Sequence, residues 1–219
     1  MSTMTETLHK EEALFIPSEA TTNGTTTDTP KHTPKVAGEY LGHITDTRTT
    51  VVDWTDKKTG NLLKARIYNF KVHVAPENSS LTYKYIDRNG HEHTTTGEVY
   101  VGWKVLADGV FRFLEPTNGD TFVSNSSGND RFLRFCQALG VTVETVQREV
   151  GGKTVEVQLL PTLEPGDING LPVTAVVNRH KEDWINDEGK SMPQWRCKFI
   201  KTWQDGKRLA ATTTDDIPF

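Results

Sequence analysis

Apolar side chains in this chain mostly alternate with polar ones, which is the period of a β-strand rather than of a helix. Two such runs, 38–54 and 62–74, flank a polar loop that contains Gly60 and suits a hairpin. The second run changes its apolar parity near Tyr68-Asn69-Phe70, so we expect a β-bulge there. With that bulge, one continuous outer face would carry Lys64, Arg66, Tyr68, Lys71 and His73.

A second hairpin pattern lies between residues 77 and 97, where strand-like runs flank Asn89-Gly90. Asn-Gly is a pair that two-residue hairpin turns favour. Because this segment has few apolar residues, we predict a β-arm that projects from the fold and contributes little to the core. Strand-like sequence follows from 99 to 114, with a turn at Asp108-Gly109.

Helical spacing appears in the middle of the chain. Four apolar residues recur there at helical intervals: Phe132, Phe135, Cys136 and Leu139. Asn129 or Asp130 would cap the start of this helix, and Gly140 would end it. A shorter helical run would follow from Thr142 to Val150. Core packing is the best explanation of the apolar stripe.

Strand patterns resume at 153–160, 173–184 and 194–203. The chain therefore has two strands, an arm, a third strand, a helical segment and then further strands. The OB-fold, a five-stranded Greek-key barrel with its helix between strands three and four, has this order. We predict a mostly β, OB-fold-like domain over 36–207, in which 153–160 is strand four and 194–203 is an extra C-terminal strand.

The composition indicates a modest folded body with polar ends. Only 35% of the residues are hydrophobic, and the mean hydropathy is -0.54. We predict a disordered arm over 1–35 and a flexible tail over 208–219. No apolar run reaches the length of a membrane span and no signal peptide is recognisable, so we expect a cytoplasmic protein. Cys136 and Cys197 lack metal-ligand spacing and are expected to be buried free thiols.

The net charge of -4 argues against a generally basic nucleic-acid binder. Between 36 and 207, however, 21 basic residues stand against 22 acidic ones, so the body is nearly neutral. Such a body can bind single strands where aromatic rings for stacking and cations for phosphate share a face. The candidates are Trp54, Lys57, Lys58, Lys64, Arg66, Tyr68, Lys71, Tyr83, Lys84, Tyr85, Trp103, Arg179, Lys181, Trp184, Arg196 and Lys198.

The last five residues, Asp215-Asp216-Ile217-Pro218-Phe219, place two carboxylates beside large apolar side chains. Such a segment suits an apolar pocket with a basic rim on a partner. It resembles the acidic C-terminal tip of bacterial single-stranded DNA-binding proteins, and the resemblance implies recruitment of replication and repair enzymes. Residues 38–205 resemble phage-encoded proteins of this class through four short motifs: Gly38-Glu39-Tyr40, the turn at 58–61, the helix end at 136–140 and the strand opening at 152–155.

These observations predict sequence-independent binding of single-stranded DNA during replication, recombination or repair, in the host cytoplasm if a phage encodes the chain. We expect no catalysis, no cofactor and no metal, because nucleophile and phosphate-loop motifs are missing and His91-Glu92-His93 lacks a third ligand. Self-association into homo-oligomers is a further alternative. The alternatives are a β-rich interaction or virion protein that does not bind nucleic acid and, more remotely, a metal-dependent nuclease.

Overall fold

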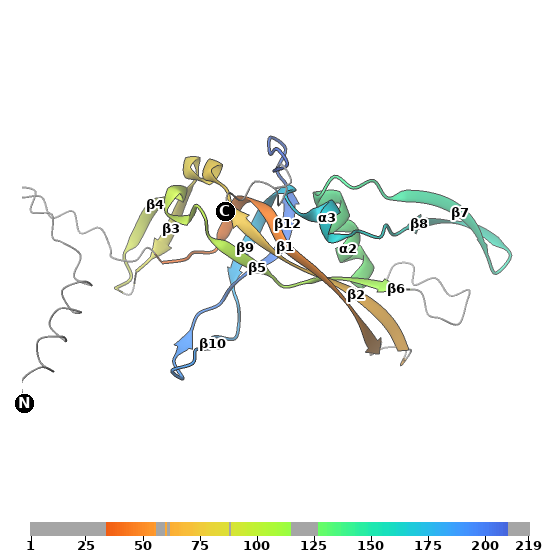
Figure 1. The fold of residues 1–219 in the computed structure, drawn as a ribbon, viewed down its shortest axis with the longest axis horizontal. Helices are drawn as coiled ribbons and strands as arrows, with labels where there is room; N and C mark the ends of the chain where they lie inside the picture. The colour runs from red at the N-terminus through yellow and green to blue at the C-terminus, as the bar shows by residue number, and fades with distance from the viewer. Residues whose placement is uncertain (1–33, 56–59, 61, 88, 115–126, 210–219) are drawn as a thin grey trace, which may run out of the picture. The chain divides into compact units, whose positions relative to one another are not determined.

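The computed structural model describes residues 34–55, 60, 62–87, 89–114 and 127–209. Five strands form a closed barrel in the order β1-β9-β12-β5-β2, with β2 pairing back onto β1 (Figure 1). Strand β12 runs parallel to β5, and the other pairs in the ring are antiparallel. These strands are β1 (Gly38–Thr55), β2 (Leu62–Val74), β5 (Lys104–Ala107), β9 (Pro172–Arg179) and β12 (Trp195–Thr202). The predicted OB-like barrel is thus confirmed, and a further strand, β6 (Val110–Leu114), pairs with β2 outside the ring.

The bulge predicted for β2 lies on β1 instead. The pairing between β1 and β2 shifts between Thr45 and Arg48, where two β1 residues oppose Phe70. Strand β2 keeps its alternation, with one buried face formed by Tyr68, Phe70, Val72 and Val74. Because β2 has no bulge, its even-numbered residues stay on one face of the strand and its odd-numbered residues on the other.

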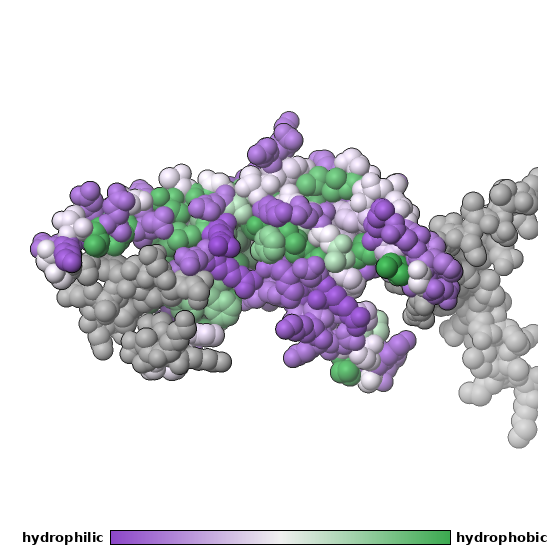
Figure 2. All heavy atoms as spheres, turned by 180° about the vertical axis from the view of Figure 1, so that it is seen from behind, coloured by the Kyte–Doolittle hydropathy of each residue, from purple (hydrophilic) through white to green (hydrophobic). Residues whose placement is uncertain are grey.

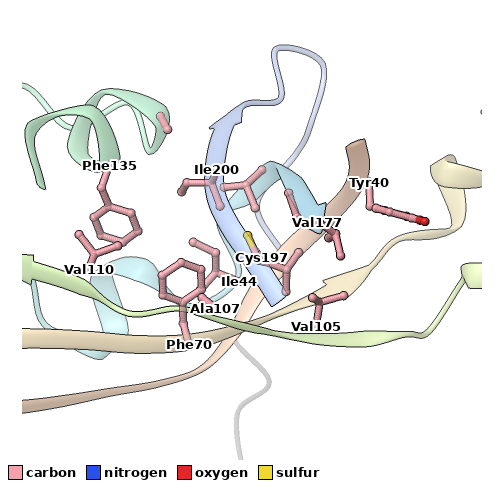
Figure 3. Close-up of a cluster of buried hydrophobic side chains, with 14 of the residues drawn as sticks. Tyr40, Ile44, Phe70, Val105, Ala107, Val110, Phe135, Val177, Cys197 and Ile200 are labelled. Carbon is pink, nitrogen blue, oxygen red and sulfur yellow. The ribbon is translucent and has the colours of Figure 1, made fainter. Parts of the chain in front are cut away.

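Helix α2 (Ser127–Ala138) packs its apolar stripe onto the barrel. Its Phe132 ring stacks on Tyr68 and its Phe135 ring on Phe70, each with centroids 5.5 Å apart. Figure 3 shows Phe135 pointing from the helix into the cluster of buried side chains around Phe70. Asn129 lies inside the first turn rather than at the cap, and its side-chain oxygen accepts the Phe113 N–H at 2.9 Å. Gly140, with a φ of 71°, follows the helix end as predicted.

The segment predicted to be barrel strand four forms a separate hairpin. Strands β7 (Glu144–Val150) and β8 (Lys153–Leu159) make a two-stranded sheet of their own, away from the barrel strands (Figure 1). The helical run predicted over Thr142–Val150 and the barrel position predicted for 153–160 are therefore wrong. β-branched residues favour the strand, and Gly151 and Gly152 supply the two positive φ values, 59° and 76°, that a tight hairpin turn requires. Barrel strands four and five are β9 and β12, so β12 is not an extra strand.

The predicted β-arm is present between β2 and β5 as the hairpin of β3 (Thr82–Ile86) and β4 (Glu92–Thr96). Its base, however, belongs to the core, because Tyr83 is 6% exposed and stacks on Tyr40 with centroids 4.6 Å apart. The expectation that the arm contributes little to the core is wrong at this end. The remaining short elements are η1 (Pro76–Ser80), η2 (Gly97–Tyr100), α3 (Pro165–Ile168), β10 (Trp184–Ile185) and β11 (Ser191–Met192).

From its first described residue the chain packs on the barrel, since Pro34 and Val36 accept the hydroxyls of Tyr100 and Tyr40 at 2.9 and 2.7 Å. The predicted disordered arm, apart from its last two residues, lies outside the described residues. So does the predicted tail with its tip, apart from Arg208 and Leu209, which hydrogen-bond to Gly166 and Gly170. Both cysteines are buried free thiols, as expected, and burial raises the pKa of Cys136 to about 11. Within the described ranges, no helix has the length and apolar character needed to cross a membrane.

Candidate nucleic-acid interface

One face of the barrel sheet turns away from helix α2. Residues that are directly opposite in an antiparallel pair project to the same side. The register therefore aligns Thr50, Ile67 and Phe111 in one row and Val52, Ala65 and Phe113 in the next. We call this surface the outer face, and its residues are Arg48, Thr50, Val52, Trp54, Ala65, Ile67, Asn69, Lys71, Lys104, Leu106, Phe111, Phe113 and Arg196.

Aromatic side chains gather where the β1–β2 hairpin extends beyond the closed barrel. The Trp54 ring lies edge-on to Phe111 and Phe113, with centroids 5.7 and 5.8 Å away. Trp54 is 38% exposed, and the two phenylalanines are half-buried. These rings supply flat apolar surface at which unpaired bases can stack.

A groove of about 530 Å³ continues the outer face over β2, β5 and β12. Its lining combines the basic side chains of Arg48, Lys71, His180 and Arg196 with the carboxylates of Asp46 and Asp108. Leu106, which is 38% exposed, adds apolar surface. The groove cations and the aromatic rings thus lie on the same face, although the rings do not line the groove.

The groove cations differ in how they are held. Lys71 forms an ion pair with Asp46 at 2.9 Å. Among the described residues, the Arg196 guanidinium donates only to the neutral side-chain oxygen of Gln194, at 2.8 Å, so no carboxylate compensates its charge there. The Arg48 side chain makes no hydrogen bond or ion pair within the described ranges. Two arginines are therefore available for phosphate oxygens.

Three of the predicted DNA-binding residues lie on the outer face: Lys71 and Arg196 line the groove, and Trp54 lies at the far end of the β1–β2 hairpin. Lys64 and Arg66 project from the opposite face of β2, and Arg66 is paired there with Glu164 at 3.2 Å. Tyr68 is fully buried under Phe132. The predicted continuous face from Lys64 to His73 is wrong, because uninterrupted alternation in β2 separates Lys64, Arg66 and Tyr68 from Lys71 and His73.

Four more of the predicted residues lie on the arm or shortly after it in the chain. Tyr83 is buried, and Trp103 is half-buried with its ring edge-on to Tyr40 at 5.3 Å. A buried ring presents no face to a base, so Tyr83 cannot be a stacking surface in this fold. On the exposed arm, Lys84 pairs with Glu92 at 2.7 Å, and Tyr85 stacks on His93.

The connection between β9 and β12 begins at the groove, which His180 lines, and forms the β10–β11 hairpin. Arg179 is paired with Asp183 at 3.0 Å, while Lys181 and Trp184 are exposed, Trp184 by 52%. Figure 2 shows this hairpin as a mainly hydrophilic projection with a hydrophobic patch near its end. The exposed Trp184 lies in a connection that starts beside the basic groove. Its ring could therefore contact a nucleotide next to those held in the groove.

Lys198 belongs to a different groove, between α2 and β12, and pairs with Asp108 at 2.7 Å. Lys57 and Lys58, in the predicted hairpin loop, lie outside the described residues.

Sequence reasoning missed Arg48, Phe111 and Phe113. The alternation of Phe111 and Phe113 with Arg112 was visible, but apolar parity suggests a buried face. In the structure the parity is reversed: Arg112 lies over the Phe132 ring of α2, with its guanidinium carbon 5.9 Å from the centroid, and the phenylalanines meet Trp54 outside. For Arg48 a signal was available in the sequence: Arg48, Thr50, Val52 and Trp54 stand at alternate positions, which predicts that Arg48 shares a strand face with Trp54.

Among the described residues, no group of three or more His, Cys, Asp or Glu side chains is arranged to hold a metal ion. Comparison of the chain with protein-family models, curated proteins and solved structures finds no match. The chemistry and geometry of the outer face are therefore the basis on which a function can be proposed.

Proposed function

We propose that this chain binds single-stranded DNA without sequence preference across the outer face. One observation carries the proposal: the Trp54, Phe111 and Phe113 rings lie on the same face as a groove lined by Arg48 and Arg196. Base stacking on aromatic rings contributes about 1–3 kcal/mol per base and tolerates every base. Cations along the same path neutralise phosphates, and OB-folds use the corresponding strand face and loops for oligonucleotides.

The proposal includes a second role for Asp215–Phe219, the recruitment of replication or repair proteins. Its support is the sequence, in which two carboxylates adjoin Ile217 and Phe219. An apolar anchor supplies affinity in a pocket, and the acids select a pocket with a basic rim.

Tryptophan fluorescence titration with oligo-dT at two salt concentrations tests the DNA proposal, because Trp54 lies in the proposed contact surface. Arg48→Gln should weaken binding and make the slope of log K against log salt shallower by roughly 0.7, the value for one phosphate contact on a single strand. Lys64→Gln is the matched control: it removes the same charge from the same hairpin, on the opposite face. It should leave the slope unchanged.

Absence of saturable oligo-dT binding would exclude the proposed function and favour a protein-interaction role. Equal effects of the two substitutions would place the strand elsewhere on the barrel. Metal-stimulated loss of the oligonucleotide would instead support the nuclease alternative.

A further inference from the structure

The bulge in β1 places one carboxylate among the cations of the outer face. Asp46 lines the groove, and its side chain accepts a hydrogen bond from Lys71 Nζ at 2.9 Å. That hydrogen bond and the charge of Lys71, with smaller contributions from Lys104 and Arg48, hold the pKa of the Asp46 carboxyl below its usual value. Three cations therefore act on one exposed anion, which is the environment that a phosphate oxygen requires.

The backbone fixes Asp46 in this position. Its φ is 53°, and among the described residues it is the only non-glycine residue with a positive φ. The left-handed conformation arises where β1 inserts its extra residue opposite Phe70, so the bulge re-aims a side chain as bulges near binding sites do. A regular β1 would not present this carboxylate to the groove in the same way.

We propose that Asp46 occupies a phosphate-binding position of the outer face, and that a nucleic-acid phosphate takes its place on Lys71, Lys104 and Arg48. This inference rests on the proposed function and specifies one phosphate subsite and its resident competitor. When the strand binds, Lys71 exchanges a carboxylate for a phosphate, so this lysine gains little net electrostatic free energy and releases few counterions. Asp46 therefore lowers the affinity and the salt dependence of the face.

Asp46→Asn tests the proposal with little disturbance of the fold, because Asn adopts the left-handed conformation as readily as Asp. Removing an exposed ion-pair competitor should tighten oligo-dT binding about two- to fivefold at low salt. Freeing Lys71 for phosphate should also steepen the salt slope by up to roughly 0.7. The thermal midpoint of the variant, measured alongside, reports that the fold is retained.

Asp53→Asn is the matched control, since it removes the same charge from the same strand, on the face that carries Lys64. It should change neither affinity nor slope. A Lys71→Met background is the second control: there Asp46→Asn should lose most of its effect, because the ammonium that Asp46 holds is gone.

The outcomes distinguish a failure of the proposed function from a failure of the phosphate subsite. If the unmodified chain fails to bind oligo-dT, the proposed function falls. If it binds but Asp46→Asn and Asp53→Asn behave alike, the carboxylate acts only through net charge and the subsite is wrong. An effect of Asp46→Asn that persists in full without Lys71 would also overturn it.

Discussion

Two tyrosines bury their rings in the barrel but differ in what their hydroxyls contact. Tyr83 donates to the Glu39 carbonyl at 2.7 Å, and its oxygen lies 2.9 Å from the Asn78 side-chain oxygen. Burial raises the pKa of Tyr83 to about 12, further above neutral pH than the ordinary tyrosine value of about 10, at which the hydroxyl is already a donor. The buried Tyr68 hydroxyl has no hydrogen-bond partner within the described part of the chain. Although both rings are buried, the two hydroxyls should therefore contribute differently to the free energy of unfolding.

Tyr83→Phe should lower the free energy of unfolding by about 1–2 kcal/mol, because a buried hydrogen-bonded network loses its donor. Tyr68→Phe should leave it unchanged or raise it slightly, since an unsatisfied buried hydroxyl is removed. Urea denaturation of both variants measures the difference, and oligo-dT affinity should be unaffected in each. A similar loss for Tyr68→Phe would show that an ordered water satisfies that hydroxyl.

The β3–β4 arm combines a core base with an exposed distal half. At the base, Gly97 donates its N–H to the Leu81 carbonyl at 2.8 Å and accepts from the Asn78 amide at 3.0 Å. A Cβ on Gly97 would lie only 1.9 Å from the Asn78 carbonyl oxygen, so this contact requires glycine. Further out, Ile86 is 70% exposed. The arm is anchored as part of the domain, while its distal half contributes little to packing.

Replacing residues 86–92 by Asn-Gly would join the paired Tyr85 and His93 through a two-residue hairpin turn. We expect the unfolding midpoint to stay nearly unchanged, because the anchored base is retained. Excision of the whole of 77–97 should instead destabilise the barrel strongly, since it removes the buried Tyr83 and Asn78. Thermal denaturation compares the two forms; equal stability would mean that the base packing is dispensable.

At the scale of the molecule, the net charge is negative, but basic side chains cluster on one surface. The chain carries a net charge of -4, yet the groove on the outer face brings Arg48, Lys71 and Arg196 together. For the proposed DNA binding, short-range contacts must outweigh a weak repulsion between the net negative chain and phosphates, and that repulsion is screened beyond about 10 Å at 0.1 M salt. Acidic segments outside the face should matter mainly at low salt.

Deleting residues 215–219 should leave oligo-dT affinity unchanged or slightly higher at low salt, because negative charge that competes with phosphate is removed. Phe219→Ala keeps the acidic side chains and should not alter affinity. Both forms should lose replication or repair proteins in a pull-down, since each lacks the apolar anchor. Equal partner recovery by the intact, truncated and Phe219→Ala chains would contradict the recruitment role.

The sequence by itself determined the mostly β class, the β1–β2 and arm hairpins, and the helix under the barrel. These follow from local signals: alternation, turn residues such as Asn89-Gly90, and helical spacing from Phe132 to Leu139. It also pointed to Trp54, Lys71 and Arg196. Tertiary structure decided which faces of β1 and β2 are outside, since the bulge near Asp46 reverses the parity of β1 and leaves that of β2 intact. Barrel closure likewise decided that β9 and β12 complete the ring while β7 and β8 do not, because such pairing depends on contacts between residues far apart in the chain.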